Sequence, residues 1–238
     1  MKHVDDYADR VPDSWRRHGG VFLPMYQSEA MWLSFSGDYP MAVKIAAGKV
    51  SAITGESWRD DLSGRPEQDY LVVPDQPWLD GFFAGEGLIR QFVATPVGEG
   101  YTAEEQITGE AEHGGLRIVV YPMKAAVYRR LDDRKFGSTQ VAYCLAEPAS
   151  SEMGLAPGGH MRQEIFEDPH GLSARDRSAK SRCFIHILDS LQYFAATAEK
   201  PPTKPPTARE YTDAGLPWFD YDDADRRALA SPSKLLKL

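Results

Sequence analysis

The sequence contains few cysteines, no long apolar run and no excess of positive charge, and each absence excludes a class of protein. Two cysteines occur in the 238 residues, whereas small secreted domains that depend on disulfides are rich in cysteine. No stretch approaches the ~20 apolar residues that a membrane-spanning helix needs. The formal net charge of −8 disfavours binding to nucleic acid, because neutralising phosphates requires a basic surface. We therefore expect a soluble protein whose partners are neither membranes nor nucleic acids.

The signatures of common enzyme classes are missing as well. There is no phosphate-binding loop, no dinucleotide-binding fingerprint and no G-x-S-x-G nucleophile elbow. No motif indicates a cofactor, so the identity of any cofactor is unknown at this level. Residues 1–20 are polar and charged and lack the apolar core of a signal peptide, which makes a cytoplasmic location the default expectation.

The pattern of apolar residues predicts a mainly β (α+β) fold, with an antiparallel β-sandwich or barrel-like core. Residues 39–58 alternate around a hairpin tip at Gly48-Lys49. Residues 114–131 are the strongest strand candidate because they contain a β-branched run. Turn signals recur at a spacing of roughly 8 to 12 residues, which is typical of sandwiches and barrels.

The chain divides by composition into three parts. Residues 1–20 are a polar N-terminal segment, and residues 21–200 form the β-rich core domain. Residues 201–238 combine a stiff proline spacer with a C-terminal arm, which we expect to be helical and to pack on the core. Residues 183–188 fit either a strand before a short helix capped by Asp189 or Ser190, or one continuous helix, and the strand is slightly favoured.

The stretch GGHMRQEIFEDPHG, residues 158–171, carries the densest group of reactive side chains. If it begins with a strand, alternation places His160, Arg162 and Glu164 on one face. This face, with Glu105 or Asp80 opposite, is a candidate catalytic site for a hydrolase or a metal-dependent enzyme. The alternative is an ordinary charged strand edge followed by a turn.

A metal ion at this face would need ligands from elsewhere in the chain. Neutral imidazole and carboxylate groups suit zinc or iron. The candidate ligands are His160, Glu164, His113 and His170. Their spacing matches no established metal signature, so the sequence leaves open whether a metal is bound.

A second cluster, YTAEEQITGEAEHGG at residues 101–115, combines several glutamates with Gln106. Two carboxylates can act as general acid and general base when burial separates their pKa values. If EEQITG forms a short strand, Glu104 and Glu105 point to opposite faces and make a poor catalytic pair with each other. The alternative is a solvated acidic loop.

The third cluster is VPDQPWLDGFF at residues 73–83. In an extended chain Gln76, Trp78 and Asp80 lie on one side. An aromatic ring beside an amide and a carboxylate often binds sugars or other polar small molecules. These residues, together with Gln106, are the ligand-binding candidates. The alternative is a proline-rich turn whose tryptophan fills one end of the core.

Three stretches together resemble a family of uncharacterised bacterial proteins. They are LPMYQSEAMWLSF (23–35), QDYLVVPDQPWLDGF (68–82) and GLPWFDYDD (215–223). The resemblance would cover most of the chain. It implies no activity, cofactor or site residue, because none is established for that family.

Two functions are weighed against each other. The favoured one is a binding or assembly domain, whose protein partner or second copy would contact an aromatic surface and the C-terminal arm. The aromatic residues concerned are Tyr26, Trp32, Phe35, Trp58, Trp78 and Trp218. The alternative is the enzyme described above. If residues 160–164, 104–106 and 76–80 meet in one cavity, the enzyme is favoured.

Overall fold

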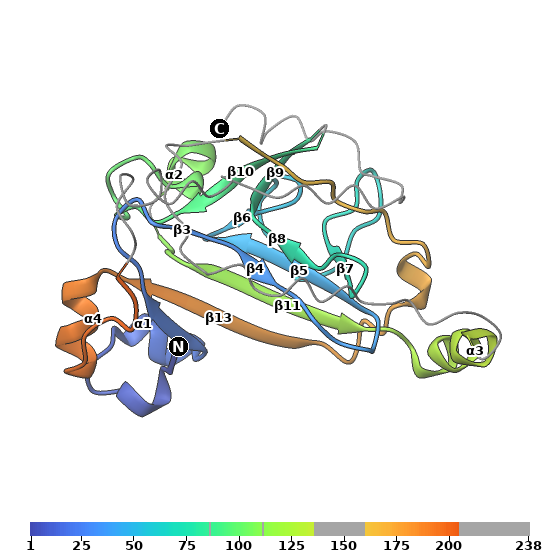
Figure 1. The fold of residues 1–238 in the computed structure, drawn as a ribbon, viewed down its shortest axis with the longest axis horizontal. Helices are drawn as coiled ribbons and strands as arrows, with labels where there is room; N and C mark the ends of the chain where they lie inside the picture. Colours follow the sequence, from blue (N-terminus) through green and yellow to red (C-terminus); the bar gives the residue numbers. More distant parts are fainter. Residues whose placement is uncertain (86, 111, 136–159, 205–238) are drawn as a thin grey trace.

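The computed structural model describes residues 1–85, 87–110, 112–135 and 160–204 of the chain. Figure 1 shows an elongated, sheet-rich arrangement with α-helices at its two ends. No helix within these described ranges is long and apolar enough to cross a lipid bilayer.

The larger sheet has seven strands in the order β1-β2-β13-β11-β5-β6, and β7 pairs with the same edge of β5 as β6. Its strands are β1 (Lys2–His3), β2 (Val21–Pro24), β5 (Met41–Ala47), β6 (Val50–Ser51), β7 (Leu71–Val73), β11 (Leu116–Pro122) and β13 (Ser181–Leu188). Every pairing is antiparallel except that of β2 with β13, which is parallel. The sheet is therefore mixed, whereas the sequence pattern predicted an antiparallel one.

A second sheet of four strands and a two-stranded ribbon complete the β structure. The second sheet contains β3 (Ala30–Met31), β9 (Gly81–Gly85), β10 (Leu88–Val93) and β12 (His160–Arg162), and the ribbon pairs β4 (Leu33–Ser34) with β8 (Trp78–Leu79). Neither sheet closes on itself in the described part of the chain, so the barrel-like option is not what the structure shows.

The main core lies where the two sheets face each other. Alternation on β5 directs Val43 and Ile45 into this core, where they join Leu71, Phe83 and Ile89 from β7, β9 and β10. All five side chains are fully or almost fully buried. Burial of this apolar area supplies the main driving force for folding.

The opposite face of the larger sheet is covered too. Ala42, Val72, Val119 and Tyr121 form a smaller core there with Tyr70. Near the N-terminus Phe22 is buried under two helices, α1 (Asp13–His18) and α4 (Ser190–Thr197). Strands β5 and β11 therefore have apolar residues on both faces, which explains why the apolar alternation along them is incomplete.

Several local predictions are confirmed. Strands β5 and β6 form the expected hairpin, with Gly48 at its tip in the left-handed region at a φ of 56°. Residues 183–188 belong to strand β13, and Asp189 caps α4 by accepting hydrogen bonds from two backbone N–H groups of its first turn.

Other local predictions are wrong. The strand expected over residues 114–131 ends at Pro122, and the remainder forms helix α3 (Ala125–Lys135). Alanine, arginine and leucine are strong helix formers, and their propensity prevails once the strand has ended. The stretch EEQITG is helical as well, in α2 (Ala103–Thr108), and HMRQEIF is a strand only over β12.

Two short 3₁₀ helices complete the described elements, η1 (Asp5–Tyr7) and η2 (Leu172–Ala174). The N-terminal segment is joined to the core, because β1 pairs with β2 and Val4 and Val11 pack against Phe22. The predicted C-terminal helix and the docking of the arm fall on residues 205–238, which lie outside the described residues.

Candidate functional site

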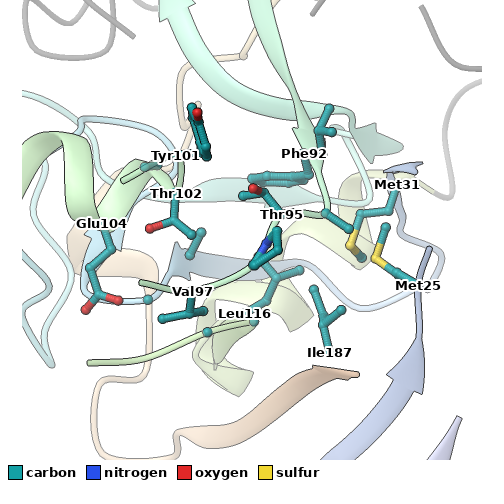
Figure 2. Close-up of a pocket in the computed structure, with 18 of the residues that line it drawn as sticks. Met25, Met31, Phe92, Thr95, Val97, Tyr101, Thr102, Glu104, Leu116 and Ile187 are labelled. Atoms are coloured by element: carbon teal, nitrogen blue, oxygen red, sulfur yellow. The ribbon is translucent and has the colours of Figure 1, made fainter. Parts of the chain in front are cut away.

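A pocket of about 700 Å³ is lined by both sheets, and we call it the inter-sheet pocket. Leu116 and Ile187 reach it from β11 and β13 of the larger sheet, while Met31 and Phe92 reach it from β3 and β10 of the second. Figure 2 shows the sulfur atoms of Met25 and Met31 next to each other on one side of this apolar group. The lining is therefore built from residues far apart in the sequence.

The rim of the inter-sheet pocket is apolar and exposed. Val93, Val97 and Tyr101 all line it. They are three of the seven exposed large apolar side chains among the described residues, and Tyr101 is 68% exposed. Exposed apolar side chains that gather around one cavity mark a binding surface more strongly than scattered ones do.

Polar groups without partners lie in the same lining. The Nε of Arg90 and the Oε1 of Gln91 are buried and have no hydrogen-bond partner. Buried polar groups are normally paired, so these atoms distinguish the pocket from ordinary core packing.

Glu104 lies at one end of the inter-sheet pocket and is only 1% exposed. Its Oε2 accepts a 3.0 Å hydrogen bond from the backbone N–H of His113, but its Oε1 has no partner. Burial raises the pKa of this carboxyl, although the hydrogen bond from His113 opposes the change. Glu104 belongs to the first turn of α2, and its hydrogen bond holds the loop that contains His113 against this turn.

Glu105, the predicted catalytic carboxylate, forms the capping box of α2 with Thr102. Its two oxygens accept hydrogen bonds from the Thr102 hydroxyl and from the backbone N–H groups of Gly98, Gly100 and Thr102. These bonds, led by the one from the Thr102 side chain, lower its pKa to about 2. The carboxylate is held ionised and is fully engaged within its own loop.

Gln106, the neighbouring ligand-binding candidate, does line the inter-sheet pocket. Its Nε2 donates a 2.7 Å hydrogen bond to the backbone oxygen of Tyr101. This bond fixes the side chain against the exposed rim. His113, a candidate metal ligand, lines the same pocket.

The other ligand-binding candidates form a buried network at β8. The Gln76 amide donates to the backbone oxygens of Trp78 and Glu164, each at 3.2 Å, and accepts from the N–H of Phe166. Gln163 repeats this pattern, donating to the Trp78 oxygen and accepting from the N–H of Asp80. The two side-chain amides thus satisfy backbone groups of residues 78–80 and 164–166 that strand pairing does not satisfy.

The structure thus brings residues 76–80 next to residues 163–166. It places Glu105, Gln106 and His113 elsewhere, because the lining of the inter-sheet pocket includes none of residues 76–80 or 162–166. Among the described side chains, the three stretches that the enzyme hypothesis needed in one cavity therefore do not meet in this pocket.

The proposed His/Arg/Glu face is only partly described. Arg162 is exposed, and Glu164 is half-buried next to Gly87. The side chain of His160 lies outside the description, although its backbone pairs with Arg90 in β12. Among the described residues, no three His, Cys, Asp or Glu side chains lie close enough together to hold a metal ion.

A second cavity of about 720 Å³ borders a buried ion pair that the sequence did not reveal. Arg175, which is 1% exposed, donates to both carboxylate oxygens of Asp168 at 2.7 and 3.0 Å. Tyr70 adds a 2.9 Å hydrogen bond to the same carboxylate. Burial alone would raise the pKa of Asp168, but the hydrogen bonds from Arg175 and its other donors outweigh burial and lower it.

The chemistry of this network is that of a structural pair. The Asp168 carboxylate is held ionised and bound on both oxygens, which leaves it a weak base. Burial raises the pKa of Tyr70, so its hydroxyl stays protonated at neutral pH. In the sequence, Asp168-Pro169 indicates a turn. A turn signal does not reveal that the Asp168 carboxylate binds Tyr70 and Arg175.

Among the aromatic residues expected to form a partner surface, Trp32 alone is exposed in the described part of the chain. Trp58 is covered by the guanidinium of Arg117 at 4.5 Å from its ring centre. Trp78 is half-buried and hydrogen-bonded to Asp80. Trp218 lies outside the described residues.

No family model, no curated protein and no solved structure matches this chain. Its function must therefore be argued from the pockets and their side chains.

Proposed function

We propose that this protein binds a small, mainly apolar molecule in the inter-sheet pocket. The observation that supports this most directly is the meeting of apolar walls from both sheets with the exposed rim formed by Val93, Val97 and Tyr101. A ligand seated there would remove this rim from water. Burial of apolar area contributes ~25 cal/mol per Å².

The volume agrees with such a role. Pockets for small organic ligands commonly measure ~300–1,000 Å³ and combine apolar walls with a few polar groups. The inter-sheet pocket, at about 700 Å³, falls within this range. The second cavity is lined by the Asp168 carboxylate, which Arg175 binds on both oxygens, and none of the described buried side-chain atoms that lack a partner belongs to its lining.

A hydrolytic or metal-dependent function receives less support. Its carboxylate Glu105 is engaged in the cap of α2, and its Arg162 lies on a different strand from the pocket lining. We therefore retain the binding domain of the sequence-based hypothesis and place its site at the inter-sheet pocket.

The test is titration of the purified protein with N-phenylnaphthylamine, a neutral apolar fluorophore. We expect saturable binding that weakens at least about tenfold in Val97→Asp, because a charge on the rim must be desolvated. Leu191→Asp is the matched control, since Leu191 is 79% exposed and does not line the pocket. Absence of saturable binding, or equal weakening by both variants, would contradict the proposal.

A further inference from the structure

We infer that the ligand of the inter-sheet pocket carries a carboxylate, and that Arg90 is the residue that binds this carboxylate. The inference rests on the function proposed above and adds the chemical class of the ligand: an amphipathic monocarboxylate with an apolar chain.

The position of Arg90 follows from strand register. Arg90 on β10 stands directly opposite Phe82 on β9, and Phe92 follows two residues later on the same strand. Residues opposite each other in an antiparallel pair share a face, as do alternate residues of one strand. Phe82, Phe92 and Arg90 all line the pocket, and the two rings pack edge to face at 5.0 Å. The side chain of Arg90 therefore leaves β10 on the same face as the two rings.

The charge of Arg90 is not neutralised within the described residues, where it takes part in no ion pair. Its Nε is buried and makes no hydrogen bond. An arginine carries its positive charge at all ordinary pH values, and a guanidinium binds a carboxylate through two parallel N–H groups. An anionic group arriving in the pocket would supply the missing acceptor.

The acidic residues of the pocket are less suited to bind a cationic ligand. Asp189 accepts hydrogen bonds from the N–H groups of Leu191 and Gln192 as the cap of α4. Glu104 is almost completely buried against the hairpin tip, and Figure 2 shows its carboxylate pointing away from Met25 and Met31. Neither carboxylate comes from the strand face that carries Phe82, Phe92 and Arg90.

The number of cations favours a carboxylate over a phosphate. Arg90 is the only lysine or arginine among the described residues that line the pocket. A phosphate monoester carries nearly two negative charges and usually meets several donors. One guanidinium beside an apolar wall matches a monoanion with an aliphatic or aromatic body.

The experiment measures binding of dodecanoate, dodecanol and dodecylammonium by displacement of N-phenylnaphthylamine. The three compounds share one chain and differ in the charge of the head. We expect dodecanoate to bind about tenfold more tightly than dodecanol, as one charge-assisted contact permits. In Arg90→Gln this preference should disappear while dodecanol binds as before, and Arg90→Lys should retain part of it. Arg130→Gln, an exposed arginine on α3, should behave as wild type.

Three other results would contradict either the carboxylate ligand or the pocket itself. Equal binding of dodecanoate and dodecanol to the wild-type protein would overturn the carboxylate while leaving the pocket as an apolar site. If dodecylammonium bound most tightly, the ligand would be a cation bound near Glu104, and the proposed carboxylate would be refuted. Binding of none of the three, with no binding of the fluorophore, would refute the proposed function itself. The wild-type comparison decides the matter even if Arg90→Gln does not fold.

Discussion

The indole Nε1 of Trp78 donates a 2.9 Å hydrogen bond to Oδ2 of Asp80, two residues further along the chain. The backbone N–H of Asp80 is at the same time held by the Gln163 side chain. The carboxyl is buried, and burial raises its pKa from the ordinary 3.8 to about 6, despite the opposing hydrogen bond from Trp78. Asp80 therefore disfavours the folded state when it is ionised.

We expect Asp80→Asn to stabilise the protein near neutral pH. The folded pKa is higher than the unfolded one, so the wild-type protein loses stability as pH rises from about 4 to about 6. Asparagine can still accept from Trp78 but does not ionise. The free energy of unfolding at about pH 8 should rise on the order of 2 kcal/mol, with a smaller change at about pH 5. Urea denaturation at the two pH values measures this, and an equal effect at both would contradict it.

Some turns and helix ends could be predicted from the sequence, because neighbouring residues determine them. The hairpin at Gly48 and the cap at Asp189 depend on residues next to each other, and both are confirmed. The spacing of Thr102 and Glu105 fits a capping box, and α2 does begin with one, so the short strand predicted for this stretch is wrong. The parallel pairing of β2 with β13 joins segments far apart in the chain and left no local signal.

The candidate site was harder to predict for the same reason. Residues 90–97 supply one continuous part of the lining of the inter-sheet pocket, but the rest comes from separate segments between Met25 and Gln192. The grouping of Gln76, Trp78 and Asp80 does form a local network, but Gln76 is occupied by backbone groups of residues 164–166. Sequence patterns identify polar residues without revealing which of them are already paired.

The buried pair of Arg175 and Asp168 should be among the most sensitive positions. Arg175→Met leaves the Asp168 carboxylate buried without its main partner and should cost about 3–5 kcal/mol of unfolding free energy. Arg175→Met combined with Asp168→Leu should cost clearly less than the sum of the two single changes, because no charge is left unpaired. Chemical denaturation of the four proteins of this cycle gives the coupling, and simple additivity would refute it.

The exposed pair of Arg177 and Asp61 provides the control for this cycle. Both side chains are more than half exposed. Arg177→Met should therefore change the unfolding free energy by less than about 1 kcal/mol. A cost as large as that of Arg175→Met would show that loss of arginine at any position, rather than an unpaired buried charge, destabilises the chain.

Glu105 offers a test of capping against catalysis. Its pKa is lowered to about 2 from 4.5 by the Thr102 hydroxyl and backbone N–H groups. Its contribution to stability is therefore present above 4.5 and is lost as pH falls toward 2. Glu105→Ala should lower Tm by a few degrees near neutral pH. Glu105→Gln should lower Tm by about half as much, because glutamine can still accept the capping hydrogen bonds. Glu99→Gln, an exposed neighbour, serves as the control. An unchanged Tm in Glu105→Ala would contradict the capping role.

His186 should make the packing of the N-terminal helix sensitive to mild acid. Its ring stacks on Trp15 of α1 at 4.2 Å between ring centres, and its Nε2 lies 3.1 Å from the backbone oxygen of Gly19. Burial lowers the pKa of His186 below 6.5, and the nearby His18 lowers it further, although the contact with Gly19 opposes this. The folded state therefore prefers the neutral ring.

The neutral ring contributes its full stability above pH 6.5, and this contribution is lost as pH falls from 6.5 toward the lower folded pKa. His186→Gln keeps a group that can donate to Gly19 but removes the titration. We expect its Tm to fall less than that of the wild type between about pH 7.5 and pH 5.5. The same change at the exposed His3 should leave the wild-type slope. Parallel slopes for wild type and His186→Gln would show that protonation of this ring does not limit the stability of the N-terminal packing.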